Sequence, residues 1–301
     1  QIIGAGATGN QVLGNYFGMA IDGSASFAGK QEGISIQNGA ANNRIEGNLI
    51  SGQQVRGVYL SYAGVGNTIH DNRIGINAAG TAPVSTSINP GIKVDNSPST
   101  VITKNWISGR FIGISIESSN NVVQGNRIGT DLNGTLNWGM TGDGIYISSY
   151  NYAANNNLIG GTGDGQGNVV AFSNQSASTY DGIALVGASS ITGNAILGNS
   201  IYGTVAGNGG LGIDLETNGV RANDPGDSDT GANNLQNFPV LQSAITNGSN
   251  QVNITGTLNS QANSYYRIEF FASPSANASG HGEGKVFLGY VNVATNASGN
   301  A

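Results

Sequence analysis

The chain contains no cysteine, and only 9% of its 301 residues are charged. The lack of cysteine excludes disulfides, thiolate chemistry and cysteine-ligated metals. No apolar run approaches the length of a membrane span, and no signal peptide is visible. The formal net charge is −6, so nucleic acid and anionic membranes would find no basic stripe to bind. The sequence therefore predicts a protein without nucleic-acid partners and without membrane insertion.

Glycine is abundant instead, with 49 residues, and 38% of the chain is hydrophobic. A polar and weakly charged composition would indicate disorder if it lacked periodicity, but aliphatic residues recur here at regular places. The length is enough for one long repeat domain and one small module.

A six-residue phrase that ends with Asn returns along the first two thirds of the chain. Its copies are Asn10-Gln-Val-Leu-Gly-Asn15, Asn43-Arg-Ile-Glu-Gly-Asn48, Asn67-Thr-Ile-His-Asp-Asn72, Thr100-Val-Ile-Thr-Lys-Asn105, Asn121-Val-Val-Gln-Gly-Asn126 and Asn194-Ala-Ile-Leu-Gly-Asn199. The final Asn residues of the first five copies are 33, 24, 33 and 21 residues apart. Repeats of about 20 to 50 residues are typical of solenoids.

Each position of the phrase has a physical reason. The middle aliphatic residue, and a second one two residues past the last Asn, are predicted to point inward from strands that bury one face. Asn suits the corner between strands, because it tolerates the left-handed backbone region and its side chain can bond to its own backbone. If coils stack about 4.8 Å apart, each corner Asn lies on the next, and their amides can form a ladder.

A second phrase consists of Gly followed by alternating apolar residues. Its copies are Gly33-Ile-Ser-Ile36, Gly57-Val-Tyr-Leu60, Gly91-Ile-Lys-Val94, Gly113-Ile-Ser-Ile116, Gly144-Ile-Tyr-Ile147, Gly182-Ile-Ala-Leu185 and Gly212-Ile-Asp-Leu215. We expect strands with two inward aliphatic residues and one outward residue, each introduced by a glycine that permits a tight bend. The longer spacings, from Ile74 to Pro90 and from Gly129 to Asp143, are predicted to be loops on one side of the solenoid.

With these repeats the chain resembles the bacterial right-handed parallel β-helix repeat proteins, relatives in shape of the pectin-lyase-like superfamily. The resemblance covers roughly residues 1–215, and its more specific pieces are Gly125-Asn-Arg-Ile-Gly-Thr-Asp131, Asn157-Leu-Ile-Gly-Gly-Thr162 and Gly212-Ile-Asp-Leu215. It implies an all-β fold and a large secreted or surface protein, without an agreed catalytic motif to map. We expect a right-handed parallel β-helix at residues 1–216, an Asp/Asn/Gly-rich linker at 217–237 and a β-sandwich module at 238–301.

Four segments of the last module alternate as strands of an Ig-like sandwich. They are Phe238-Pro-Val-Leu, Gln251-Val-Asn-Ile-Thr, Tyr265-Tyr-Arg-Ile-Glu-Phe-Phe271 and Lys285-Val-Phe-Leu-Gly-Tyr-Val-Asn-Val293. Such sandwiches have about seven strands, so we expect further sequence or a neighbouring molecule to supply a missing one. The start, Gln1-Ile-Ile-Gly, lies inside a coil without a polar cap. This favours a piece of a longer protein, associated with itself or with adjoining domains.

Three charged residues form the candidate catalytic set. Aligning the Gly-led strands places Lys93 in one outward column, and Asp95 and Glu117 in adjacent coils of the next column. Two carboxylates and a base can in principle hold calcium or act as acid and nucleophile on a polysaccharide. The alternative is a solvated surface pair steadied by Lys93, which is the more common arrangement.

Aromatic residues offer a second candidate site. Tyr59, Tyr62, Tyr146 and Tyr150, with Tyr152, can form a platform for sugar rings, or they can be ordinary strand aromatics. Alignment on the corner Asn residues also stacks Tyr16, Leu49, Arg73, Trp106 and Arg127. This predicts that Trp106 lies between two guanidinium groups, in a stabilising role.

The stretch from Asn223 to Asn234 is the candidate metal site. Asp224, Asp227 and Asp229 alternate with Gly and Ser, a spacing that turns several oxygens toward one hard cation such as calcium. The stretch matches no EF-hand pattern, and an Asp-rich hydrated linker is the alternative. No cofactor is otherwise required.

Three functions remain open at this point. The favoured one is a non-catalytic, extracellular or cell-surface structural or adhesive protein, a rigid rod that assembles into a fibre or layer. The second is a polysaccharide lyase or glycoside hydrolase that uses Lys93, Asp95 and Glu117. The third is a carbohydrate-binding module that uses the tyrosines alone. A fold by itself does not decide among them.

Overall fold

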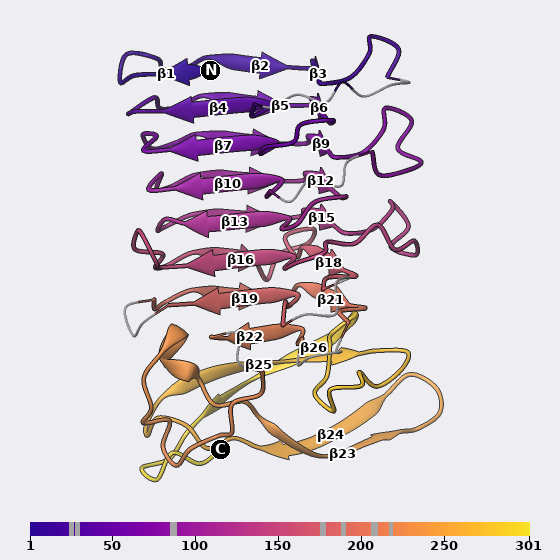
Figure 1. Ribbon diagram of the computed structural model, residues 1–301. Helices are drawn as coiled ribbons and strands as arrows, with labels where there is room; N and C mark the ends of the chain where they lie inside the picture. Colours follow the sequence, from indigo (N-terminus) through magenta and orange to yellow (C-terminus); the bar gives the residue numbers. More distant parts are fainter. Residues whose placement is uncertain are drawn as a thin grey trace.

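The structure is a computed structural model. It describes residues 1–23, 27, 31–84, 89–174, 179–187, 191–205, 210–216 and 219–301. Three parallel sheets wind together into a right-handed parallel β-helix, and two antiparallel hairpins follow at the C-terminal end (Figure 1). The predicted all-β fold and its resemblance in shape to parallel β-helix proteins are therefore confirmed.

The sheets take their strands in turn, one from each coil. The eight-stranded sheet contains β1 (Ile2–Ile3), β4 (Ile34–Gln37), β7 (Val58–Ser61), β10 (Ile92–Asp95), β13 (Ile114–Glu117), β16 (Ile145–Ser148), β19 (Ile183–Val186) and β22 (Ile213–Leu215). The second sheet contains β2 (Gln11–Leu13), β5 (Arg44–Glu46), β8 (Thr68–His70), β11 (Val101–Thr103), β14 (Val122–Gln124), β17 (Leu158–Gly160) and β20 (Ala195–Leu197). The third contains β3 (Tyr16–Phe17), β6 (Leu49–Ile50), β9 (Arg73–Ile74), β12 (Trp106–Ile107), β15 (Arg127–Ile128), β18 (Val169–Ala171) and β21 (Ser200–Tyr202).

The interior of the β-helix is one continuous stack of aliphatic side chains. Both repeated phrases contribute to it, as their inward positions predict. Ile36, Leu60, Val94 and Ile116 follow one another in the eight-stranded sheet, and each is fully buried. Each coil therefore buries its apolar residues only by stacking on its neighbours, which is the basis of solenoid stability.

Close packing requires the glycines that open six strands of the eight-stranded sheet, which are Gly33, Gly57, Gly91, Gly113, Gly144 and Gly182. A Cβ added at Gly57 would lie 2.6 Å from the carbonyl oxygen of Gly91 and 2.7 Å from Ile74 Cγ2. The same clash would arise at Gly91, which faces Ile107 Cγ2 at 2.6 Å. The Gly-led phrase therefore reflects contact between neighbouring coils as well as the bend that the sequence predicted.

Two columns of corner Asn residues form ladders along the β-helix. In one column the backbone N–H and side-chain Nδ2 of each Asn both donate to Oδ1 of the Asn below. It runs through Asn15, Asn48, Asn72, Asn105, Asn126, Asn168 and Asn199, with donor–acceptor distances of 2.8–3.2 Å. The predicted amide ladder is confirmed, and it pairs the polar groups that the corners bury.

The second ladder is interrupted once. It runs through Asn10, Asn43 and Asn67, continues after Thr100 through Asn121, Asn157 and Asn194, and ends on Asn233. At Thr100, where the phrase lacks its first Asn, the hydroxyl donates to the carbonyl of Ser97 at 3.0 Å. The backbone N–H of Thr100 still donates to Asn121 Oδ1 at 2.9 Å. The ladder therefore lacks one side-chain amide at Thr100, but the backbone hydrogen bond to the next Asn is kept.

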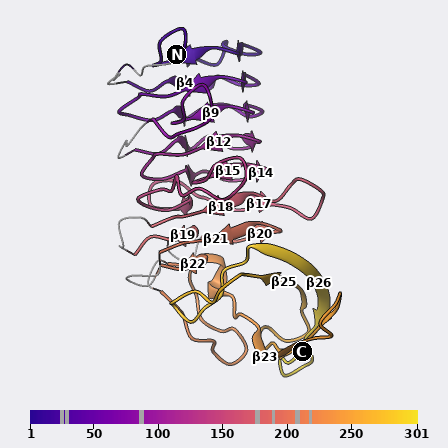
Figure 2. The same cartoon turned by 90° about the vertical axis from the view of Figure 1, so that its right-hand side faces the viewer.

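The C-terminal part lies beyond β22, at the end of the β-helix opposite the N-terminus (Figures 1 and 2). A short 3-10 helix, η1 (Ala232–Leu235), precedes two hairpins. One hairpin pairs β23 (Val240–Thr246) with β24 (Val252–Thr257), and the other pairs β25 (Tyr265–Ala272) with β26 (Val286–Ala294). β24, β25 and β26 lie where the sequence predicted strands, whereas β23 begins at Val240 instead of Phe238 and continues to Thr246. The four strands form a β-sandwich-like tail.

The C-terminal part closes the open end of the β-helix. Ala232 of η1 is fully buried in the aliphatic core. The backbone N–H of Ile201 in β21 donates to the carbonyl of Gly284 at 2.8 Å, so this segment lies against the edge strand of the third sheet. Glu269 Oε2 accepts the N–H of Gly198 at 2.7 Å. No helix in the described part of the chain is long and apolar enough to cross a membrane.

Candidate functional site

The candidate charged site lies on the outer face of the eight-stranded sheet. The strand register places Tyr59, Lys93, Ser115 and Tyr146 in one outward column, as the alignment predicted. Asp95 pairs with Glu117 in the adjacent column two residues further on. The parallel register, which repeats with each coil, is what brings these residues together.

Lys93 lies between the two carboxylates. Its Nζ is 3.4 Å from Asp95 Oδ1 and 3.3 Å from Glu117 Oε1. The Tyr59 hydroxyl donates to Asp95 Oδ2 at 3.0 Å, and Asn151 Nδ2 donates to Glu117 Oε2 at 2.7 Å. Each carboxylate therefore has a cation and a neutral donor, and the five side chains form one connected network.

The loop after β16 covers this network. It carries Asn151 onto Glu117 at the end of the neighbouring strand β13, and Tyr152 onto Tyr62 near the end of β7. As a result, only 8% of Asp95 and 6% of Glu117 are exposed. A substrate would have to displace the loop before it could reach either carboxylate, which weakens the arrangement as a catalytic pair.

Burial also changes the acidity of the network. Burial raises the pKa of Asp95 above its usual value, and the nearby charge of Glu117 adds to the increase. Lys93 and the Tyr59 hydroxyl oppose it. Loss of water around a carboxylate disfavours its charged form, whereas a neighbouring cation favours it. Lys93 and the Tyr59 hydroxyl thus offset part of the effect of desolvation on the pKa of Asp95.

The tyrosines on this face have different surroundings. Tyr62 and Tyr152 meet edge to face, with 5.4 Å between ring centroids and 2.7 Å between hydroxyl oxygens. This hydrogen bond, followed by burial, raises the pKa of Tyr152 to about 12. Tyr62 is 50% exposed and Tyr150 is 70% exposed. The guanidinium of Arg56 lies over the ring of Tyr59, 4.1 Å from its centroid, so that ring face is covered.

The neighbours of the Trp106 ring agree with the prediction on one side and differ from it on the other. Arg73 lies over its ring at 5.9 Å, as predicted. Arg127 pairs with Trp106 in the register, but its Nη1 donates to the carbonyl of Asp131 at 3.4 Å. Trp138, from the loop after β15, stacks on Trp106 with 5.5 Å between centroids. The prediction missed Trp138 because loop positions do not follow the repeat.

The predicted metal ligands lie together. One oxygen from each of Asp224, Asp227 and Asp229 lies within 4.8 Å of the others. Asp227 accepts hydrogen bonds from Asn237 N at 2.8 Å and Ser260 Oγ at 2.7 Å. Oδ1 of Asp224 and Oδ1 of Asp229 are buried atoms without a hydrogen-bond partner. Hard oxygen donors and two orphaned lone-pair sites fit a calcium ion.

The pKa values of two carboxyl groups in this loop are shifted by their surroundings. Burial, and then Asp224 and Asp227, raise the pKa of Asp229 above its usual value. Hydrogen bonds from Ser228 lower the pKa of Asp224. A divalent cation would relieve the repulsion, because it would stabilise all three carboxylates in their charged form. Calcium at this loop stays a prediction.

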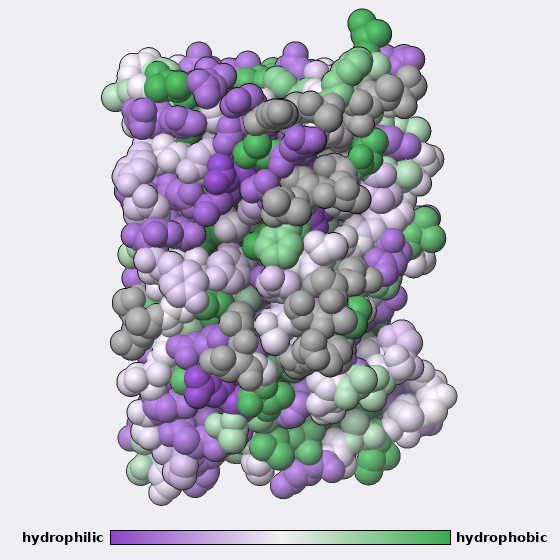
Figure 3. Space-filling model, viewed as in Figure 1, coloured by the Kyte–Doolittle hydropathy of each residue, from purple (hydrophilic) through white to green (hydrophobic). Residues whose placement is uncertain are grey.

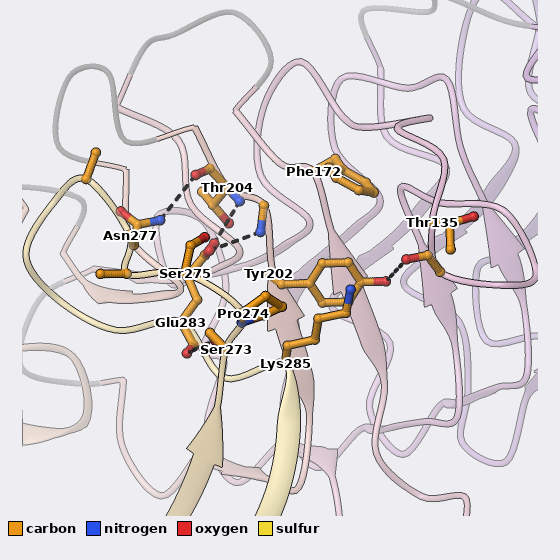
Figure 4. Close-up of a pocket in the computed structure, with 14 residues that line it drawn as sticks. Thr135, Phe172, Tyr202, Thr204, Ser273, Pro274, Ser275, Asn277, Glu283 and Lys285 are labelled. Atoms are coloured by element: carbon orange, nitrogen blue, oxygen red, sulfur yellow. Dashed lines mark hydrogen bonds between the residues drawn. The ribbon is translucent and has the colours of Figure 1, made fainter. Parts of the chain in front are cut away.

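A hollow of about 510 Å³ lies where β21 meets the loop between β25 and β26 (Figure 4). Tyr202 forms part of its wall and donates to the carbonyl of Gly134 at 2.8 Å. Lys285 Nζ lies 4.2 Å from the centroid of the Tyr202 ring. Glu283 accepts the N–H groups of Gly203 and Thr204 at 3.0 and 2.7 Å. These contacts join the β-helix to the hairpin, so the hollow is the seam between them.

Sequence reasoning missed two features of the charged site. Asn151 and the loop that carries it lie outside the repeat, and nothing in their spacing indicates which coil they cover. Arg56 could have been found, because it directly precedes the Gly-led phrase at Gly57. Its side chain forms an ion pair with Glu32 at 3.0 Å, and Glu32 holds the same place in the preceding coil.

Comparison with known proteins adds no identity to this geometry. No protein-family model matches the chain, and no curated protein matches it. The fold and the site geometry are therefore the observations on which a function can be argued.

Proposed function

We propose that the chain is a non-catalytic, extracellular structural or adhesive protein, a rigid β-helix rod that assembles into a surface fibre or layer. The observation that carries the proposal is the pair of Asn ladders beside a continuous aliphatic core, which together run through all the coils. Within the stack, each corner and each core residue is held by the coils on both sides of it, and at the N-terminal end by one neighbouring coil. Such an array resists bending and local opening better than a domain with long unpaired loops.

The charged network also supports a structural role. Asp95 and Glu117 are covered and already bonded, so they tie together β7, β10, β13 and the loop after β16. A general acid or nucleophile must instead reach the bond that it cleaves. We expect no depolymerisation of pectin or alginate by the purified chain. Depolymerisation that is lost in Asp95→Asn would contradict the proposal and favour a lyase or hydrolase.

The hairpins provide the surface for assembly. Large apolar residues stand exposed on them, including Leu241 at 61% and Ile245 at 66% in β23. Each hairpin has two strands, so each strand keeps one edge without a ladder partner in its sheet. Figure 3 shows hydrophilic residues over much of the β-helix and green, apolar residues gathered near the hairpins. Exposed apolar strands with open edges favour pairing with another copy.

Electron microscopy and sedimentation of the full chain test this assembly. We expect filaments or concentration-dependent oligomers, and we expect L241K/I245K to shift the chain toward monomer. Leu132→Lys is the matched control, because Leu132 is also 61% exposed but lies in a loop of the β-helix. Monomeric wild-type protein at all concentrations would contradict self-association, as would equal loss of association in both variants.

Carbohydrate binding is the second candidate function, and the exposed tyrosines favour it. Tyr62 and Tyr150 keep 50% and 70% of their surface exposed on the face that carries the charged network. Flat rings with polar edges suit stacking against sugars. Retention on immobilised polysaccharides should fall in Y62A/Y150A and persist in Tyr265→Ala, since Tyr265 is 87% exposed but lies in β25. Equal retention of all three proteins would remove this candidate.

A further inference from the structure

The last coils contain two stacked buried acids at the corner that precedes the eight-stranded sheet. Asp143 and Asp181 each stand two residues before a strand of the eight-stranded sheet, and the register of β16 with β19 places them in successive coils. Asp143 Oδ1 accepts the N–H of Asp181 at 2.7 Å, and Asp181 Oδ1 accepts the N–H of Leu211 at 2.7 Å. Asp143 is 2% exposed, and Asp181 is fully buried.

The two Asp residues reproduce the accepting half of an Asn ladder: each accepts a backbone N–H from the next coil. An Asn rung accepts a backbone N–H and a side-chain Nδ2 through its Oδ1 and donates through its own amide, whereas an ionised carboxylate can only accept. Oδ2 of Asp181 is a buried atom without a hydrogen-bond partner. A proton on that carboxyl would remove the buried charge and restore a donor.

In the described part of the chain, no ion pair brings a positive charge to these acids. Among the described residues, neither Asp143 nor Asp181 forms an ion pair with Lys or Arg. The charged group that faces both is Asp214 of β22, which is itself 3% exposed. The other titratable groups nearby are two phenols, Tyr146 of β16 facing Asp143 and Tyr180 preceding Asp181 in the chain. Ionisation would therefore place like charges in a buried, uncompensated site.

We propose that Asp143 and Asp181 are proton-carrying rungs that hold the last coils and the C-terminal cap closed in acidic solution and loosen them progressively as the solution becomes alkaline. Asp181 lies where its ionisation can affect the final coil and the cap. Leu211, which donates to Asp181, precedes β22, and η1 contacts both β19 and β22. A negative charge at Asp181 strengthens the single hydrogen bond from Leu211, but it is desolvated and repelled by Asp143 and Asp214, so its ionisation favours opening of the final coil to water.

The acidities of the two groups agree with this geometry. Burial raises the pKa of Asp143 to about 7 and that of Asp181 to about 8, and Asp214 adds to both increases. Hydrogen bonds from backbone N–H groups oppose the increases. In the unfolded chain both groups return to the usual value of 3.8. The folded state then binds more protons between these values, so stability falls as pH rises from about 4 to about 8.

Hydrogen exchange of the full chain at pH 6 and pH 9, corrected for intrinsic exchange rates, tests the proposal. We expect protection in β16, β19 and β22 to fall about tenfold or more relative to β5 and β8, since one pKa unit corresponds to a tenfold change. D143N/D181N should abolish this relative loss, because Asn carries a permanent amide donor. Asp164→Asn is the control, since it removes an exposed carboxylate of equal charge and should keep the loss.

A spectroscopic measurement keeps the test independent of folding defects. Infrared or carbon NMR titration of the wild-type chain should show protonated Asp side chains at pH 6 that are lost by pH 9. Asp181→Asn should remove one of them. Titration of all Asp residues near their usual value would overturn the proposal, as would equal alkaline loss of protection in wild type and D143N/D181N. Protection at pH 9 that a chelator removes would also overturn it, because the carboxylates would then hold a cation.

Discussion

At the residue scale, one side-chain type solves the main problem of the corners. A corner buries backbone N–H groups that have no strand partner, and an Asn amide accepts from one coil while it donates to another. Asn126 shows the full set: it accepts from Asn105 N and Nδ2 and donates to Asn168 Oδ1 and to the carbonyl of Ile102. An apolar residue would leave several of these groups without partners.

Replacement of Asn126 by Ala should lower the free energy of unfolding by about 2–4 kcal/mol, because it leaves buried donors and acceptors unpaired. Urea unfolding followed by circular dichroism measures the change. Asn133→Ala is the control, since Asn133 is exposed in a loop and should change stability by less than about 0.5 kcal/mol. Equal effects of the two substitutions would mean that the ladder adds no stability.

Lys93 makes a second prediction at this scale. Lys93→Met removes the cation between two largely buried carboxylates and should destabilise the fold by about 2 kcal/mol near neutral pH. The pKa of Asp95 is already raised, so the folded state binds extra protons and loses stability as pH rises through that pKa. The variant should therefore lose more stability at pH 8 than at pH 4.

Melting temperatures of wild type and Lys93→Met at the two pH values measure this difference. Lys104→Met is the control, because Lys104 is exposed on a corner and has the same change in charge. A loss that is the same at pH 4 and pH 8 would show that Lys93 contributes packing rather than charge.

At the scale of elements, two loops outside the repeat stabilise other parts of the molecule. The loop after β16 covers the charged network, and the Asp-rich loop joins η1 and β24 to the end of the β-helix. Asp227 binds the backbone of Asn237 and the hydroxyl of Ser260, two segments that are distant in sequence. Such loops stabilise by holding other elements together, so removal of one ligand should act on the junction as a whole.

Calcium at the Asp-rich loop should stiffen this junction. We expect millimolar calcium to raise the melting temperature and a chelator to reverse the effect, because binding to the folded state alone stabilises by about 2.7 kcal/mol at a hundred times Kd. Asp229→Asn should reduce the shift, while Asp164→Asn should leave it unchanged. No shift of the wild type at millimolar calcium would remove the metal site.

At the scale of the whole molecule, the β-helix behaves as a one-dimensional stack. A coil in the middle has a neighbour on both sides, whereas β1, β2 and β3 pair with one neighbouring strand each. Stability then follows the number of neighbours, so opening should begin at an end and spread inward. The hairpins and η1 cover the other end, which should make the two ends unequal.

Hydrogen exchange at constant pH should show this gradient. Amides of β10 to β15 should exchange most slowly and those of β1 to β3 fastest, with β22 between them because the C-terminal part covers it. Peptide-level mass spectrometry measures the order. Uniform protection along the chain would mean that the molecule opens in one cooperative step.

Much of the fold follows from local sequence pattern. The Asn phrase and the Gly-led phrase recur in most coils, so alignment of one copy on the next yields the strand register. That register correctly placed Lys93, Asp95 and Glu117 together. It did not place Asn151 or Trp138, because loop residues take their positions from contacts with coils that are far away in sequence.

The sequence by itself determined the coil, its inward aliphatic residues and its corner ladders, because these depend on periodic contacts between neighbouring repeats. The tertiary structure alone decided what covers the coils. It buried Asp95 and Glu117 under a loop, laid Gly284 along β21, and stacked Asp143 on Asp181. Burial and the chemistry that follows from it are properties of the assembled surface, so the shape of this protein could be predicted from its repeats and the acidity of its carboxyl groups could not.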